Sequence, residues 1–120
     1  MAKMKVFVTR DHPESALKDL RKLYSVKINL EDRPVSKAEL IKAVRGLDGI
    51  IPCVGDMIDG EVMDASGGTL KAICNSIVGF DNVDLKAATE RGIYVTNTPG
   101  VLTETVADLT FGLILTAARR

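Results

Sequence analysis

The sequence has no net charge, because 16 lysine and arginine residues balance 16 aspartate and glutamate residues. A balanced chain produces no long-range positive field, which argues against nucleic acid and anionic lipid as partners. No apolar run reaches the length of a membrane span, and the first residues lack the apolar region and cleavage site of a signal peptide. We therefore expect a cytoplasmic protein with no membrane partner.

Cysteine and histidine are scarce. The chain has two cysteines, Cys53 and Cys74, and one histidine, His12, without the Cys-x-x-Cys or Cys/His spacing of a metal site. Each cysteine lies near the end of an apolar stretch, so we expect two buried thiols, with a disulfide as the alternative if their strands are neighbours. His12 precedes Pro13, and we interpret it as a surface residue at the start of a helix.

The glycine fingerprint of dinucleotide-binding proteins is also absent. In Gly-x-Gly-x-x-Gly, a strand leads into a helix whose N-terminus binds the pyrophosphate. Here the pair Gly67 and Gly68 follows a predicted helix instead of a strand, and the other glycines have the wrong spacing. We therefore expect no tight binding of NAD by this chain alone.

The sequence does contain a regular alternation of strand and helix patterns. Ser36 and Glu39 form a capping box that begins a helix, and Gly92 is the type of residue that ends one. Pro13 stands at a plausible first helical position. Strands are predicted at residues 5–9, 25–30, 49–54, 70–75 and 93–97, and each strand is followed by a helix. The helices after the second, third, fourth and fifth strands are predicted at about residues 36–46, 61–65, 83–91 and 103–119.

This alternation predicts the fold class. Each right-handed crossover between parallel strands places its helix against the sheet, so we expect a mostly parallel sheet covered on both faces. The resulting fold is α/β, a flavodoxin-like three-layer sandwich with a five-stranded parallel sheet, expected order 2-1-3-4-5. A length of 120 residues accommodates one such domain, residues 1–120.

The last predicted helix is apolar around most of its circumference. One sheet face cannot cover that whole surface, so a partner chain or an absent domain is expected to cover the rest. A homodimer through residues 103–118 is one outcome, and a helix folded back onto the fifth strand is the other. The apolar side chains of this helix are Val106, Ala107, Leu109, Phe111, Leu113, Ile114 and Leu115.

Ligands of open parallel sheets bind beyond the carboxyl ends of the strands. Three loops follow predicted strands here: Thr9–His12, Cys53–Asp56 and Ser76–Gly79. Gly79 lets the backbone approach a ligand closely, and successive free N–H groups around it can bind a carboxylate. The alternative for Gly79 is a simple turn that requires positive φ.

Three segments carry a family resemblance: Gly79–Asp84, Asn97–Pro99 and Val106–Asp108. Over essentially all 120 residues the chain resembles the D-isomer-specific 2-hydroxyacid dehydrogenases, most of all the glyoxylate and hydroxypyruvate reductases. The resemblance implies that residues 1–120 are the substrate-binding domain and that residues 103–120 form the helix leading into an absent cofactor domain. From the local sequence alone, we interpret Asp81 and Asp84 as turn and helix-capping residues and not as a catalytic or metal-binding pair.

The same resemblance implies roles for individual residues. Main-chain amides of the loop after the fourth strand bind the substrate carboxylate, and the loop after the third strand lies beside the substrate with an apolar wall that limits its size. One residue of the last helix lines the nicotinamide pocket, with plain helix packing as the equal alternative. The substrate-binding residues so implied are Val54, Gly55, Ser76, Ile77, Val78 and Gly79, and the cofactor-binding residue so implied is Val106.

The resemblance therefore implies a chain that binds a small 2-oxo or 2-hydroxy acid but carries no catalytic residue. In the family, the catalytic histidine, an arginine, a carboxylate and the binding site for NAD or NADP come from sequence beyond this chain, so we expect the chain alone to be inactive. The alternative is a free-standing flavodoxin-like binding or dimerisation module. A phosphoacceptor receiver or a flavin-binding protein is disfavoured, because Cys53 ends the third strand and Arg10–Pro13 lacks the glycines of a phosphate loop.

Overall fold

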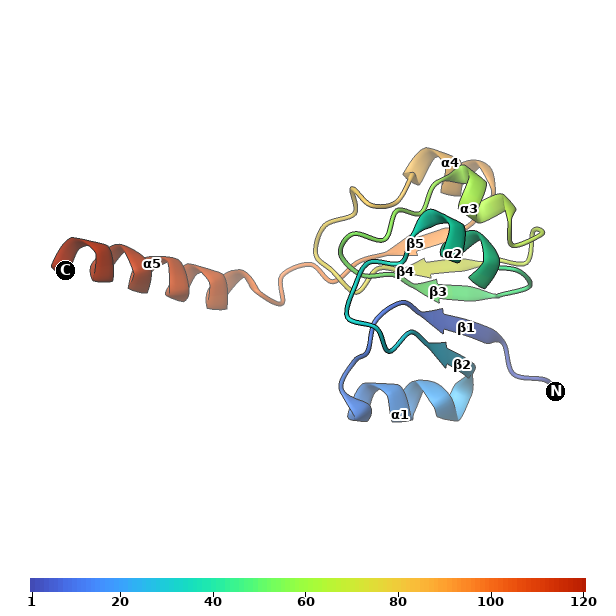
Figure 1. Ribbon diagram of the computed structural model, residues 1–120, viewed down its shortest axis with the longest axis horizontal. Coiled ribbons are helices and arrows are strands. Elements are labelled where there is room, and N and C mark those ends of the chain that lie inside the picture. Colours follow the sequence, from blue (N-terminus) through green and yellow to red (C-terminus); the bar gives the residue numbers. More distant parts are fainter.

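A computed structural model describes all residues from Met1 to Arg120. Its centre is a five-stranded parallel sheet of order β2-β1-β3-β4-β5, which confirms the predicted topology (Figure 1). The strands are shorter than predicted, all of them at the carboxyl end and β4 and β5 also at the amino end. They are β1 (Lys5–Val8), β2 (Ser25–Ile28), β3 (Gly49–Ile51), β4 (Ala72–Cys74) and β5 (Tyr94–Thr96).

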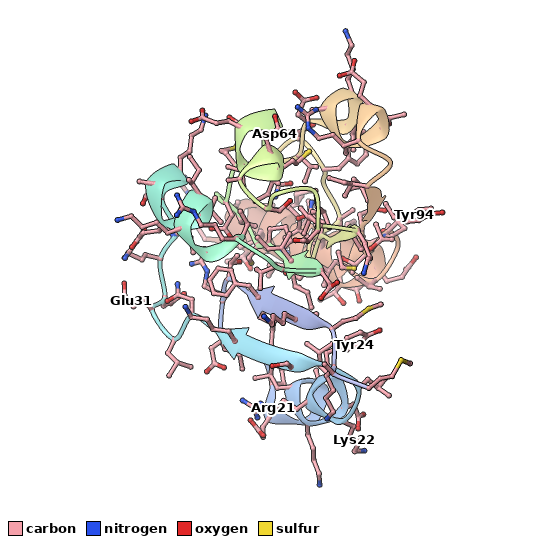
Figure 2. All side chains as sticks on the ribbon, turned by 90° about the vertical axis from the view of Figure 1, so that its right-hand side faces the viewer. Arg21, Lys22, Tyr24, Glu31, Asp64 and Tyr94 are labelled. Atoms are coloured by element: carbon pink, nitrogen blue, oxygen red, sulfur yellow. The ribbon has the colours of Figure 1, made fainter.

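Five helices follow the strands in turn. Figure 2 shows Arg21 and Lys22 of α1 on one side of the sheet and Asp64 of α3 on the other. The predicted α/β sandwich is thus present, although the helical layer on one face consists of α1 alone. The helices are α1 (Glu14–Leu23), α2 (Lys37–Ala43), α3 (Gly60–Asp64), α4 (Leu85–Glu90) and α5 (Thr103–Arg119).

The main hydrophobic core lies between the sheet and the layer of α2, α3 and α4. Phe7, Ile50 and Ile73 contribute from the three central strands, because alternate residues of a strand face the same side. The helices contribute apolar residues such as Leu40 and Val62. Burial of this face supplies the main apolar driving force for folding.

The opposite face of the sheet is covered incompletely. Leu17 is the one buried residue of α1, and a hollow of about 360 Å³ remains between α1 and strands β3 and β4. Tyr94 of β5 lies exposed at its outer side (Figure 2). The expected cover on both faces is therefore wrong for β3 to β5, because no helix of this chain covers these strands on the α1 side of the sheet (Figure 1).

Local signals in the sequence explain the helix ends. The Ser36 hydroxyl accepts from the Glu39 N–H at 3.4 Å, and the Glu39 carboxylate accepts from the Ser36 N–H at 2.9 Å, which confirms the capping box. Asp84 is the N-cap of α4 and accepts from the Ala87 N–H at 2.9 Å. Gly92 ends α4 with φ of +64°. Pro13 is the residue before α1 and not its first helical residue.

The cysteines and the histidine differ from expectation in how deeply they are buried. Both cysteines are free, and Cys53 is half-buried whereas Cys74 is exposed. The prediction of two buried thiols is wrong, because Cys74 ends β4 on the α1 side of the sheet, where a hollow separates β4 from α1. His12 directly precedes the N-cap of α1, as predicted, but it is half-buried with its Nε2 atom enclosed and so is less exposed than expected.

Helix α5 extends away from the rest of the molecule (Figure 1). None of its residues is buried, and the molecule measures 59 × 32 × 24 Å as a result. The apolar side chains expected to need burial are exposed to solvent in this chain. None of the helices combines the length and apolar character needed to cross a membrane.

Candidate site at the carboxyl edge of the sheet

The loops that follow β1, β3 and β4 lie side by side. The N–H of Thr9 donates to the Ile51 carbonyl at 3.1 Å, which joins the ends of β1 and β3. Ser76, after β4, donates to the Pro52 carbonyl through its N–H at 3.1 Å and through its hydroxyl at 2.9 Å. The three loops chosen from the sequence therefore share one edge of the sheet.

Residues 77–79 of the loop after β4 have their carbonyl groups paired and their amides free. The Ile77 carbonyl accepts from the Thr98 N–H at 3.0 Å. The Val78 carbonyl accepts from Asn97 Nδ2 at 2.8 Å, and the Gly79 carbonyl accepts from Asn75 Nδ2 at 3.0 Å. The N–H groups of Ile77, Val78 and Gly79 donate to no acceptor in the chain. This loop is thus a run of three unused main-chain donors, which is the arrangement that binds anions.

Nothing within the chain explains why residue 79 is a glycine. Its φ is not positive, so the alternative of a turn that needs a left-handed residue is wrong. A Cβ atom at this position would meet no atom within 4 Å. The space beside the Gly79 backbone is therefore open, which permits close approach of a ligand.

Two buried asparagines lie beneath this loop. Asn75 and Asn82 are 2% and 7% exposed. Their side-chain amides pair reciprocally, with Nδ2 of Asn75 at 2.7 Å from Oδ1 of Asn82 and Nδ2 of Asn82 at 3.0 Å from Oδ1 of Asn75. The remaining hydrogens of the two amides reach the carbonyls of Gly79 and Asp56. All amide hydrogens of the pair have acceptors, as buried polar groups require.

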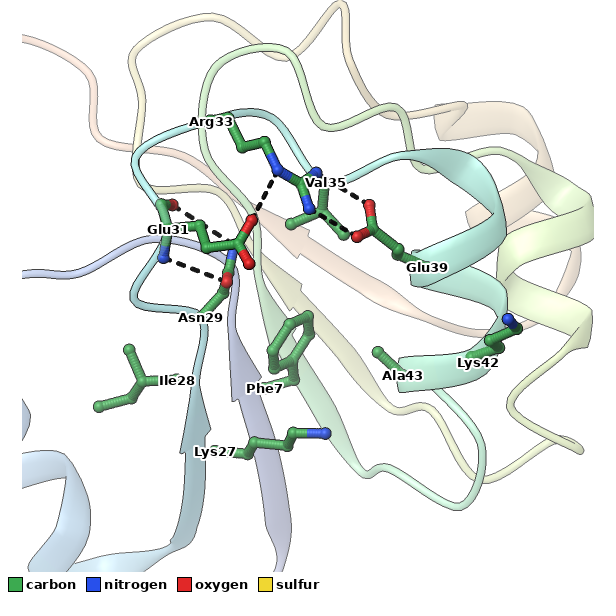
Figure 3. A pocket seen from close by; sticks show the side chains of 10 residues that line it. All are labelled: Phe7, Lys27, Ile28, Asn29, Glu31, Arg33, Val35, Glu39, Lys42 and Ala43. Carbon is green, nitrogen blue, oxygen red and sulfur yellow. Dashed lines mark hydrogen bonds and ion pairs between the residues drawn. The ribbon is translucent and has the colours of Figure 1, made fainter.

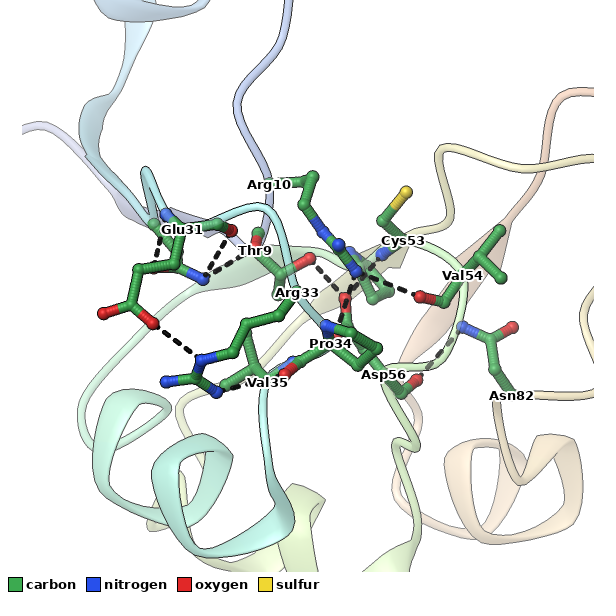
Figure 4. Close-up of polar contacts among 12 residues, drawn as sticks. Thr9, Arg10, Glu31, Arg33, Pro34, Val35, Cys53, Val54, Asp56 and Asn82 are labelled. Carbon is green, nitrogen blue, oxygen red and sulfur yellow. Dashed lines mark hydrogen bonds and ion pairs between the residues drawn. The ribbon is translucent and has the colours of Figure 1, made fainter.

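The loop after β3 is held by a buried carboxylate. Asp56 is fully buried and accepts from the Thr9 hydroxyl, from the Val35 N–H at 2.7 Å and from the Cys53 N–H at 2.8 Å (Figure 4). Three hydrogen bonds from neutral donors compensate the removal of this carboxylate from water. The loop that contains Val54 is thereby joined to the end of β1 and to the segment before α2.

Arg10 adds a second contact to that loop. Its Nη2 atom donates to the Val54 carbonyl at 3.1 Å and lies 4.0 Å from the Asp56 carboxylate. The Val54 side chain itself points into solvent and is 64% exposed. An exposed apolar side chain next to the carboxyl edge is able to act as a wall for a small ligand.

The backbone conformation and the close packing at residue 55 both require a glycine. Its φ is +89°, and a Cβ atom would lie 2.8 Å from Cγ of Pro34. The segment before α2 packs directly against this backbone. Gly55 therefore shapes the loop, in contrast to Gly79, which leaves open space.

Asn75, Asn82 and Asp56 organise the site, although the sequence alone did not identify them. A signal for Asp56 was present, since a carboxylate five residues after the buried strand β3 needs partners if it folds inward. The asparagine pair had no such signal. Seven positions separate Asn75 from Asn82, and their contact depends on the path of the loop between them.

A second hollow, of about 300 Å³, lies between α2 and the strands β1 and β2 (Figure 3). Arg33 lies beside it and forms ion pairs with Glu31 and Glu39, both at 2.7 Å. These contacts, led by the one to Glu39, raise the pKa of Arg33, and the Arg33 guanidinium lowers the pKa of Glu39. None of the predicted substrate-binding residues lines this hollow. The ion pairs connect the loop after β2 to α2.

Val106 lies apart from the other predicted residues. It belongs to the first turn of α5, where its N–H donates to the Leu102 carbonyl at 2.9 Å. Its side chain is 57% exposed. Packing of Val106 within this chain is not observed, and its role beside a nicotinamide stays a prediction.

The chain matches known proteins over its whole length. Residues 6–118 match the family model described as D-isomer specific 2-hydroxyacid dehydrogenase, catalytic domain. A glyoxylate reductase of Thermofilum pendens is 48% identical over 121 residues, and one of Korarchaeum cryptofilum is 45% identical over 118 residues. These alignments cover 100% and 98% of this chain but 35% of each relative. The chain thus spans about a third of the length of these relatives.

Solved structures show the same fold. A protein from Thermus thermophilus superposes with a TM-score of 0.87 at 52% identity, covering 98% of this chain and 37% of that one. A cofactor (NAD+)-bound 3-phosphoglycerate dehydrogenase of Entamoeba histolytica gives a TM-score of 0.76 at 31% identity, covering 94% of this chain and 38% of that one. The paired carbonyls and free amides after β4 therefore lie in a chain that belongs to the D-isomer-specific 2-hydroxyacid dehydrogenase family.

Proposed function

We propose that this chain is the substrate-binding portion of an NAD(P)-dependent D-2-hydroxyacid dehydrogenase of the glyoxylate and hydroxypyruvate reductase type. Its ligand is the carboxylate of a small 2-oxo or 2-hydroxy acid. The amides of Val78 and Gly79 bind that carboxylate, with Ser76 and Ile77 beside them. The supporting observation is the run of unused N–H donors at Ile77, Val78 and Gly79, whose own carbonyl groups are all paired.

The free amides of this loop complement a carboxylate in charge and in hydrogen-bonding capacity. An ionised carboxylate only accepts hydrogen bonds, and bonds from main-chain N–H groups to an anion are shorter and stronger than bonds between neutral groups. Because Gly79 has no side chain, the ligand is able to approach the backbone. Val54 and Gly55 lie on the adjacent loop, so the exposed Val54 side chain limits how large a substituent the acid carries.

The chain contributes binding but no hydride transfer in this proposal. The single histidine, His12, has an enclosed Nε2 atom and belongs to the loop after β1. The adjacent glycines Gly67 and Gly68 follow α3 and do not form a turn between a strand and a helix, so the residues present do not fit the pyrophosphate of a dinucleotide. NAD or NADP therefore binds to a cofactor domain outside these 120 residues, and Val106 is the one residue here proposed to line the nicotinamide pocket.

A second candidate function is association through α5. The helix exposes six large apolar side chains, an amount that isolated surface residues do not explain. A second copy of the chain or the cofactor domain is the proposed partner of this surface.

Residue-resolved titration tests the proposed function. We expect glyoxylate to shift the amide resonances of residues 76–79 and 54–55 in a ¹⁵N-labelled sample, and to shift few others. Methyl glyoxylate is the control, because it keeps the two-carbon oxo acid unit but replaces the charged carboxylate by a neutral methyl ester, and it should leave these resonances in place. Scattered shifts, or none at high glyoxylate concentration, would reject the carboxylate site.

A further inference from the structure

We propose that Asn97 is a positioning residue that orients the Gly79 N–H toward the ligand, and that Thr98 and Asn75 do the same for the two neighbouring peptide units. This inference rests on the proposed function for its ligand. It concerns three consecutive peptide planes, between residues 77 and 80, each of which is held by a different partner.

The planarity of the peptide bond carries the argument. In a trans peptide, the carbonyl of one residue and the N–H of the next point in opposite directions and rotate as one unit. A group that binds the carbonyl therefore determines where the following N–H points. Rotation that would turn this N–H away must first break the hydrogen bond of the carbonyl.

Each plane of the loop has such a partner. The Thr98 N–H binds the Ile77 carbonyl at 3.0 Å and so orients the Val78 N–H. Asn97 Nδ2 binds the Val78 carbonyl at 2.8 Å and so orients the Gly79 N–H. The same relation holds one residue on, where Asn75 Nδ2 binds the Gly79 carbonyl at 3.0 Å and orients the N–H of the next residue, Phe80.

The partners themselves are fixed by the sheet and the core. Asn97 directly follows β5, and Asn75 is buried against Asn82. The N–H of Asn75 also donates to the Thr96 carbonyl at 2.8 Å, which ties the ends of β4 and β5 together. The three orienting groups thus lie within two residues of the ends of β4 and β5, whereas the amides they orient are free. Because these contacts already order the loop, the loop loses less conformational entropy when the ligand binds.

Asn97→Ala tests this assignment at single-residue resolution. The change removes the donor to the Val78 carbonyl and leaves the Thr98 contact intact. We expect glyoxylate binding to weaken about fivefold, the order of one lost hydrogen bond. The shift of the Gly79 amide should be lost while that of Val78 persists, and Asn97→Gln, which keeps an amide donor, should recover part of the Gly79 response.

Asn29→Ala is the matched control. Asn29 likewise follows a strand, β2, and its Nδ2 donates to main-chain carbonyls, those of Thr9 and Glu31, at 3.2 and 3.4 Å. This variant removes a similar contact from another loop, so it should bind glyoxylate as the parent chain does. If glyoxylate shifted the Gly79 amide resonance equally in Asn97→Ala and in the parent chain, the inference would be overturned.

A measurement without ligand separates this inference from the proposed function. Residual dipolar couplings report the orientation of the Gly79 N–H bond, which should change in Asn97→Ala and in the isosteric Asn97→Asp but not in Asn29→Ala. An unchanged orientation in both Asn97 variants would overturn the positioning role, whether or not glyoxylate binds. Failure of the parent chain to bind glyoxylate, together with a changed orientation, would reject the proposed function alone.

Discussion

Two glycines of the candidate site are required by different partners. Gly55 has φ of +89° and lies against Pro34, whereas Gly79 has neither a positive φ nor a neighbour within reach of a Cβ atom. The fold therefore requires Gly55, whereas we propose that ligand binding requires Gly79.

Alanine substitutions separate these two requirements. Gly55→Ala should lower the free energy of unfolding by about 1–3 kcal/mol, the usual cost of a strained backbone. Gly79→Ala should leave it unchanged while weakening glyoxylate binding by about tenfold, or about 1.4 kcal/mol. Urea unfolding and titration of both variants provide the comparison. Equal destabilisation by the two substitutions would contradict the account.

Asp56 is the residue on which the Val54 loop depends. Asp56→Ala would leave the Thr9 hydroxyl and the N–H groups of Val35 and Cys53 without their acceptor. We expect a loss of about 3 kcal/mol in the free energy of unfolding, since each buried unsatisfied donor costs about 1–3 kcal/mol and such costs are not fully additive.

Asp56→Asn is the control for that experiment, because it retains one acceptor oxygen. It should be less destabilising than Asp56→Ala in urea unfolding. Similar values for the two variants would show that neither the retained volume nor the retained acceptor oxygen of asparagine stabilises this loop, and would contradict the prediction.

At the scale of elements, α3 depends on a carboxylate that titrates. Asp59 is the N-cap of α3, accepting from the Val62 N–H at 3.0 Å, and forms an ion pair with Lys37 of α2 at 2.7 Å. The Lys37 contact first, and then the Val62 N–H, lower the pKa of Asp59 below its ordinary value of 3.8. Because the folded chain holds the ionised form, this contribution to stability is present above pH 3.8 and is lost as the pH falls through the lowered pKa.

Asp59→Asn tests this pH dependence. Asparagine caps a helix without titrating, so the variant should lose less stability than the parent chain between pH 5 and about pH 2. Urea unfolding at several pH values measures the difference, with Asp108→Asn on the exposed α5 as the control. An identical acid dependence of the parent and Asp59→Asn would exclude Asp59 as a contributor.

The sequence allowed the elements to be predicted but not the details between them. Strand order followed from the alternation of strands and helices, and the capping of α2 and α4 followed from the local patterns at Ser36–Glu39 and Asp84. The pairing of Asn75 with Asn82 and the exposure of Cys74 depend on contacts between distant segments and on which face a helix covers. The local periodicity of the sequence does not report which distant segments come into contact or which sheet face a helix covers.

At the scale of the whole molecule, two apolar surfaces lack a partner. One is α5, and the other is the sheet face beside α1, which includes Ala72 and Tyr94. Burial of apolar area drives association at about 25 cal/mol per Å² before the costs of binding. We therefore expect the chain to associate, and α5 to carry the contact.

Sedimentation at several concentrations tests this expectation. The parent chain should shift from monomer toward dimer as concentration rises, and the double variant Phe111→Ser with Leu115→Ser should not. Both residues are exposed on α5, so neither change affects the core of the sheet domain. A parent chain that stays monomeric at every concentration would contradict a dimer through α5.

The claim at the centre of this account is that main-chain amides after β4 bind a carboxylate, and a crystal structure of the chain with glyoxylate tests it most directly. The account predicts a carboxylate oxygen at about 2.7–3.1 Å from the nitrogens of Val78 and Gly79, with Val54 beside the other end of the ligand. Glyoxylate bound elsewhere, with both of these nitrogens still unused, would contradict it.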